Sequence, residues 1–144
     1  MFCAFLAIIT LFGLLFTLTN PAALLQSFLM AGIVLYGWFA NRFYVYVMIG
    51  KQKISKKQKD WLQVNAIVAF IASILGIKES IYIFYHPHVF DDVLKDMPAQ
   101  NIPPQNLIIN VAIILLAVCS ILLIHIIWTY IFIRKNKAYI VEAD

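Results

Sequence analysis

The sequence predicts an all-α integral membrane protein built as a bundle of four transmembrane helices. Of its 144 residues, 63% are hydrophobic and only 12% are charged, whereas a soluble domain is about half apolar and a quarter charged. The apolar residues fall into four runs, each long enough for a hydrocarbon core of about 30 Å. These observations exclude an ordinary soluble domain, a disordered chain and a secreted disulfide scaffold, and they indicate one membrane domain over residues 1–144.

The first two runs predict spans at about residues 2–19 and 22–41. The first run lacks the basic start and the small-residue cleavage site of a secretory signal peptide, so we expect it to be retained as a span. Asn20 and Pro21 separate the two runs and form a typical helix start, with Asn at the N-cap and Pro at the first helical position. Arg42 marks the expected inner end of the second span.

A basic loop and two longer runs follow. Residues 51–60 read KQKISKKQKD, with five lysines, and predict a short solvated loop. The third run predicts a span over residues 61–85. A long outer loop, residues 86–106, then leads to the fourth span at residues 107–133, which as a helix would be about 40 Å long.

The distribution of basic residues predicts the orientation of these spans. Nine of the eleven Lys and Arg lie at Arg42, in the 51–60 loop or in the C-terminal tail, and Lys78 and Lys95 lie on the other side. Cytoplasmic loops carry the excess of Lys and Arg, so we expect both termini in the cytoplasm and a location in the plasma (inner) membrane. The lipid bilayer is the expected partner, with a homo-oligomer or a larger membrane complex in addition. Nucleic acid is not expected, because the lysines border apolar runs.

A stripe of small residues occupies the third span. Steps of three and four residues place its members on one face of a helix. Lipid provides no hydrophobic drive for helix association, so small residues that allow two backbones to approach closely take that role. We predict that this face packs against another helix. Its members are Ala66, Ala69, Ser73, Gly76 and Ser80.

Polar residues within the spans are expected to gather near the two membrane faces. Lys78, Glu79, Gln26 and Asn110 lie within about one and a half turns of the outer boundary, or about 8 Å. They form either a set of hydrogen-bonded boundary charges or an outward-facing pocket for a ligand or partner, and both interpretations stay open. His125 lies near the inner boundary, and we predict a hydrogen-bonded histidine there in preference to a ligand or proton carrier.

The outer loop adds a weaker hypothesis. Apolar residues between Val89 and Met97 recur at helical spacing and predict a short amphipathic helix on the outer surface. Histidine and aspartate are ordinary zinc ligands, although aspartates in a first helical turn are also explained by the helix macrodipole. The candidate metal ligands are His86, His88, Asp91 and Asp92.

These features favour a non-enzymatic small membrane protein, acting as an accessory, scaffold or effector subunit through helix packing and its outer loop. The sequence lacks the zinc-protease, nucleophile-elbow and phosphate-loop motifs, so we expect neither an enzyme nor a cofactor. The alternative is a subunit of an oligomeric transporter or channel for small solutes, with a polar path between subunits. A third hypothesis is an enzyme acting on lipid at the outer leaflet through His86, His88 and the aspartates.

Overall fold

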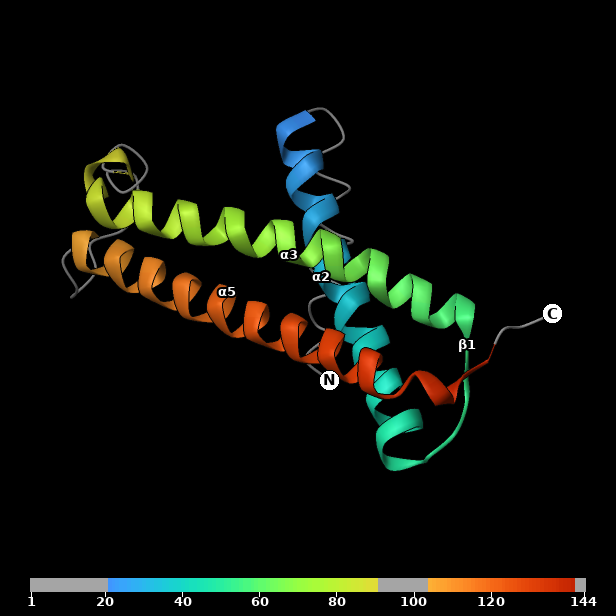
Figure 1. Ribbon diagram of the computed structural model, residues 1–144. Coiled ribbons are helices and arrows are strands. Elements are labelled where there is room, and N and C mark those ends of the chain that lie inside the picture. The colour runs from blue at the N-terminus through green and yellow to red at the C-terminus, as the bar shows by residue number, and fades with distance from the viewer. Residues whose placement is uncertain (1–20, 91–103, 142–144) are drawn as a thin grey trace. The chain divides into compact units, whose positions relative to one another are not determined.

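The computed structural model describes residues 21–90 and 104–141, which are helical apart from two short strands and the connections between elements (Figure 1). Three helices in this part of the chain are long, and each is apolar enough to cross a membrane by length and composition. They are α2 (Pro21–Phe43), α3 (Lys56–Tyr85) and α5 (Pro104–Lys135).

The predicted all-helical class is therefore confirmed for the described residues, and three of the four predicted spans are helices compatible with a membrane protein. Helix α2, which the structure describes from Pro21 onward, contains the predicted second span. Helix α3 ends at Tyr85, as predicted, and α5 extends the fourth apolar run at both ends. The predicted first span, residues 2–19, lies outside the described residues, so the fourth helix of the predicted bundle stays a prediction.

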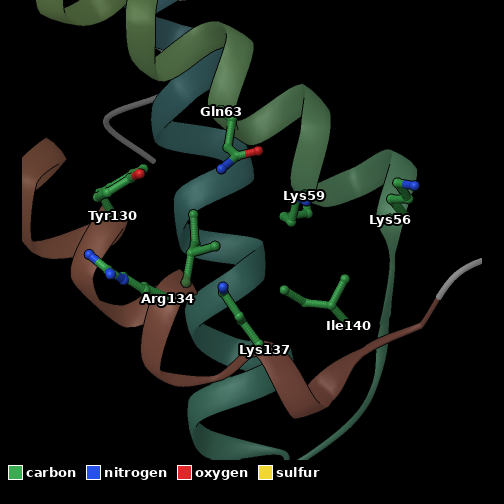
Figure 2. Close-up of a pocket in the computed structure, with 8 residues that line it drawn as sticks. Lys56, Lys59, Gln63, Tyr130, Arg134, Lys137 and Ile140 are labelled. Atoms are coloured by element: carbon green, nitrogen blue, oxygen red, sulfur yellow. The ribbon is translucent and has the colours of Figure 1, made fainter.

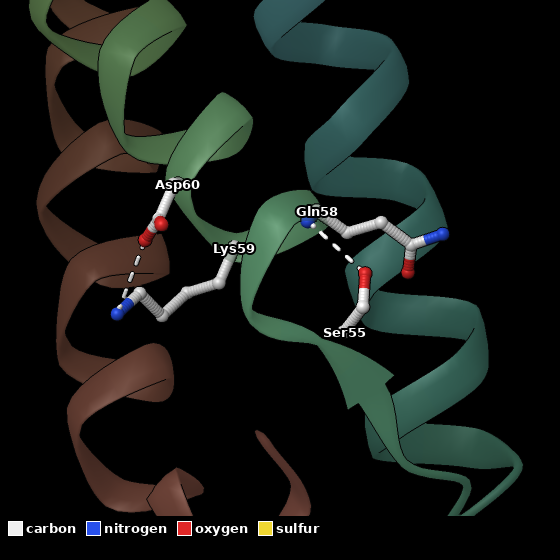
Figure 3. A network of polar contacts seen from close by, with 4 residues as sticks. All are labelled: Ser55, Gln58, Lys59 and Asp60. Carbon is white, nitrogen blue, oxygen red and sulfur yellow. Dashed lines mark hydrogen bonds and ion pairs between the residues drawn. The ribbon is translucent and has the colours of Figure 1, made fainter. Parts of the chain in front are cut away.

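Helix α3 begins five residues earlier than the apolar run that predicted it. The sequence analysis placed residues 51–60 in a solvated loop, but α3 begins at Lys56. The backbone N–H of Gln58 donates to Oγ of Ser55 at 3.3 Å (Figure 3). Ser55 thus acts as the N-cap, with Gln58 three residues later, which is the spacing of a capping box.

The connection between α2 and α3 contains an unusual turn. Helix α2 continues into the π-helix η1 (Tyr44–Ile49), and the N–H of Gly50 donates to the carbonyl oxygen of Val45 at 3.0 Å. Lys51 follows with a φ of 51°, in the left-handed region that few residues other than glycine adopt. The chain then enters β1 (Ile54–Ser55), which pairs in parallel with β2 (Ile140–Val141), and Ile54 lies opposite Ile140.

The chain divides into two compact units. The first comprises Met1–Ala72 and His125–Asp144, and the second comprises Ser73–Ile124. In the described part of the first unit, α2 crosses the beginning of α3 and the end of α5 (Figure 1). A Cβ atom added at Gly32 of α2 would collide with the Val68 side chain of α3. These two helices therefore approach each other closely at Gly32.

The second unit contains the end of α3 and the beginning of α5, which run antiparallel (Figure 1). A Cβ atom added at Gly76 would lie 2.5 Å from Sγ of Cys119 on α5. Since nonbonded carbon and sulfur atoms do not approach so closely, a side chain at this position would require the Cys119 thiol to move. Ser80 is buried one turn later, and its hydroxyl donates to the carbonyl oxygen of Gly76 at 2.7 Å.

We expect Gly76→Ala to lower the free energy of unfolding by about 1–3 kcal/mol, because the added methyl group overpacks the contact with Cys119. Cys119→Ala removes the sulfur atom, so the double variant Gly76→Ala/Cys119→Ala should recover most of the loss caused by Gly76→Ala. Thermal unfolding in detergent measures all three variants. If Gly76→Ala unfolds at the same temperature as the parent protein, α3 and α5 do not approach each other closely at Gly76.

We expect Ser55→Ala to cost about 1 kcal/mol, because the N–H of Gln58 loses its acceptor at the start of α3. Ser55→Asp supplies another acceptor and a negative charge at a helix N-terminus, so it should be at least as stable as the parent protein. Chemical denaturation in detergent compares the two variants. Equal losses for Ala and Asp would show that Ser55 acts through the pairing of β1 with β2.

Candidate functional site

The residues of the predicted outer pocket are exposed. The amine of Lys78 lies 3.8 Å from the carboxylate of Glu79 on α3, and their side chains are 74% and 57% exposed. Asn110, on α5 of the same unit, is also exposed. Gln26 is exposed on α2, in the other unit. Glu79 thus has Lys78 as an ionic partner, and a ligand pocket at these four residues stays a prediction.

Two of the four candidate metal ligands lie in the described part of the outer loop. His86 stacks on the Tyr82 ring at a centroid distance of 4.7 Å, and its Nδ1 lies 3.2 Å from the Tyr82 carbonyl oxygen. His88 lies in the short 3-10 helix η2 (Pro87–Phe90). The two aspartates and most of the predicted amphipathic helix fall outside the described residues. Within the described ranges, no group of three His, Cys, Asp or Glu residues could hold a metal ion.

The small residues of α3 differ in burial. Ala69, Ser73 and Ser80 are buried, with at most 2% of their surface exposed. Ala66 and Gly76 are half-buried. Gly76 faces Cys119 of α5, which identifies α5 as its neighbouring helix.

A polar cluster within the first unit joins α2 to α5. Tyr36 of α2 is only 1% exposed. Its hydroxyl donates to Oγ1 of Thr129 at 3.0 Å and lies 2.8 Å from Nδ1 of His125. The Tyr36 and His125 rings meet edge to face, with centroids 5.7 Å apart. Two polar side chains of α5 therefore converge on one phenol of α2.

The hydrogen bonds of this cluster determine the tautomer of His125. A phenol has one proton, and the Tyr36 proton goes to Thr129. Nδ1 of His125 must therefore carry its own proton and donate it to the phenolic oxygen. The result is a directed chain from His125 through Tyr36 to Thr129, in which both donors have acceptors.

The sequence predicted the hydrogen bond of His125, which is confirmed, but it did not predict the partners. Two signals were available. A tyrosine in the middle of an apolar span needs a partner for its hydroxyl, because an unpaired polar group in hydrocarbon is costly. Thr129 follows His125 by four residues, so both lie on one face of a helix. Neither signal says which helices meet.

Asn65 and Ser120 are polar side chains that bond within their own helices. Asn65 is buried, and its amide donates to the carbonyl oxygen of Trp61 at 2.8 Å. The hydroxyl of Ser120 donates to the carbonyl oxygen of Leu116 at 2.8 Å. Bonds of this kind satisfy a polar group within its own helix and do not link two helices. The Tyr36 cluster differs because it connects two helices.

We expect Tyr36→Phe to lower the free energy of unfolding by about 1–2 kcal/mol, because His125 and Thr129 lose a partner in a region without water. Tyr44→Phe is the matched control, since Tyr44 is half exposed at the start of η1. Thr129→Val should cost less in the Tyr36→Phe background than in the parent protein. Thermal unfolding in detergent measures the series, and equal melting of the two Tyr→Phe variants would contradict the cluster.

Comparison with known proteins finds no relative: no family model, no curated protein sequence and no solved structure matches this chain.

Proposed function

We propose that the chain is a non-enzymatic subunit of a membrane assembly and acts as an accessory, scaffold or effector component. In this proposal it is a bundle of four transmembrane helices in the plasma (inner) membrane, with both termini in the cytoplasm. It acts through helix packing and its outer loop. The supporting observation is that polar side chains inside the described spans bond to each other. Tyr36 of α2 bonds to His125 and Thr129 of α5, and these bonds hold the two helices together.

The surface that the described spans turn outward is largely apolar. Large exposed side chains of α3 and α5 include Ile67, Ile71, Ile74, Ile113, Ile114, Ile121, Ile124 and Ile127. In a membrane, such a surface contacts either acyl chains or another protein. Lipid is as apolar as isoleucine, so the quality of side-chain packing determines which of the two it contacts. An apolar exterior with inward-bonded polar groups is suited to a subunit that works by contact.

The exposure of His125 supports the proposal that the chain is part of an assembly and does not act alone. Its ring is exposed, although it lies within the span of α5 and its Nδ1 is bonded to Tyr36. Trp128, one turn later, is 60% exposed on the same side of α5. A polar ring facing acyl chains is unfavourable, so a second protein that covers this side of α5 would stabilise both residues.

The same exposed histidine favours the second candidate function, an oligomeric transporter or channel for small solutes. A polar path between subunits would be lined by side chains that face out of the single chain. His125 of α5 is exposed, as are Lys78 and Glu79 of α3.

Photo-crosslinking in intact membranes tests the assembly. A photoreactive amino acid replaces Trp128 in the full chain, and the control replaces Ile127, which is 54% exposed and lies about 100° away around the helix. We expect a discrete adduct with a second polypeptide from position 128 and mainly lipid adducts from position 127. An adduct of twice the chain mass would identify a homo-oligomer. The absence of any protein adduct from position 128 would contradict the proposal.

Reconstitution in liposomes separates the two candidates. The assembled protein is incorporated and the flux of small ions and solutes is measured, with His125→Leu as the variant. The accessory proposal expects no flux above empty liposomes for either protein. A flux that disappears in His125→Leu would favour the transporter or channel.

A further inference from the structure

A basic cavity of about 620 Å³ lies in the first unit, where the beginning of α3 meets the end of α5 (Figure 2). Lys59 lines it from α3 and Arg134 lines it from α5, and Lys137 contributes from the short 3-10 helix η3 (Lys137–Tyr139). Lys56 is a fourth cationic lining residue. Asp60 offsets part of this charge, since its carboxylate lies 3.3 Å from the amine of Lys59. The cavity retains an excess of positive charge and attracts an anion.

An apolar groove of about 500 Å³ adjoins this cavity between the same two helices. Gln63, Tyr130 and Ile133 line both, so the two spaces lie next to each other. Beyond these residues the groove is walled mainly by apolar side chains, among them Phe70 and Ile127. From Gln63 to Phe70 it follows about 10 Å of helix.

The order of these two spaces corresponds to the order of layers in a bilayer. The basic cavity lies at the ends of the two spans, where Arg134 and Lys135 close α5. The groove extends from there toward the middle of the spans, past Tyr130, an aromatic residue of the kind that marks the membrane interface. A ligand that fills both spaces must carry negative charge at the interface and an apolar chain in the hydrocarbon.

We propose that this composite site binds one anionic phospholipid. Its phosphate lies among Arg134, Lys137 and Lys59, and one acyl chain lies in the groove beside Ile127. Arg and Lys are the residues that bind phosphate oxygens, and the Arg guanidinium can hold two of them at once. Basic pockets between transmembrane helices bind anionic headgroups for this reason. A soluble phosphate would leave the apolar groove without a ligand, so the groove favours a lipid.

Native mass spectrometry and thermal unfolding of the full chain in detergent test the proposal with three probes. The first is phosphatidylglycerol, the second is phosphatidylcholine with identical acyl chains, and the third is glycerol 3-phosphate without chains. We expect phosphatidylglycerol to bind at one molecule per chain, saturably, and to raise the melting temperature. Phosphatidylcholine should bind at least about tenfold more weakly, which corresponds to a loss of about 1.4 kcal/mol or more of headgroup attraction. Glycerol 3-phosphate should neither bind detectably nor displace the lipid.

Two pairs of variants locate the site. Arg134→Gln/Lys137→Gln removes two charges from the cavity, and Lys51→Gln/Lys53→Gln removes two charges from the neighbouring loop, outside the lining. We expect the first pair to weaken phosphatidylglycerol binding about tenfold or more and the second less than about threefold. Ile127→Trp should obstruct the groove and weaken binding, whereas Ile124→Trp, at an exposed position outside its lining, should not.

Several results would overturn the proposal. Equal weakening by the two charge pairs would indicate diffuse attraction to a basic surface. Equal binding of the two lipids would show that the headgroup is not recognised. Competition by glycerol 3-phosphate would identify a site for soluble anions. The comparison of the three probes uses the parent protein, so it decides the question even if a variant fails to fold.

Discussion

Every polar group that the protein carries into the hydrocarbon core must find its partner within the protein, because no water is available there. This constraint explains the long uninterrupted helices, in which the backbone satisfies itself. It also explains why the hydroxyl of Ser120 bonds to a carbonyl oxygen one turn earlier. Where a polar group cannot be satisfied within its own helix, it has to join two helices. Tyr36 does so, and its bonds to His125 and Thr129 attach α2 to α5.

The elements that follow from local chemistry were predictable from the sequence. Helix α3 ends at Tyr85 as predicted, because the end of an apolar run is a local signal. The start of α3 was misplaced because five lysines in residues 51–60 outweighed a shorter signal. Ser55 and Gln58 have the spacing of a capping box, and lysine is itself a good helix former. A high density of charged residues indicates that a segment is exposed to solvent. The exposed end of a helix meets that condition as well as a loop does, so the lysines did not distinguish the two.

The contacts between distant residues could not be predicted. Tyr36 and Thr129 are 93 positions apart, and no local pattern specifies that their helices meet. The basic cavity illustrates the same limit. The sequence predicted that the lysines near residue 59 and the cations after residue 133 lie on one side of the membrane, but their convergence around one cavity depends on how α3 and α5 pack. The outer pocket was inferred from depth alone, and depth does not determine which faces of two helices are turned toward each other.

The bond between Tyr36 and His125 also implies an order of events during biosynthesis. The two residues are 89 positions apart, so Tyr36 enters the membrane well before its partner has been translated. At about 5–20 residues per second, the interval is roughly 4–18 seconds. During that time the phenol needs a temporary acceptor, which a hydrated insertion channel or a membrane chaperone can supply. The bond to His125 makes α2 more stable in lipid once α5 has arrived, so insertion of α5 and packing of α2 are coupled.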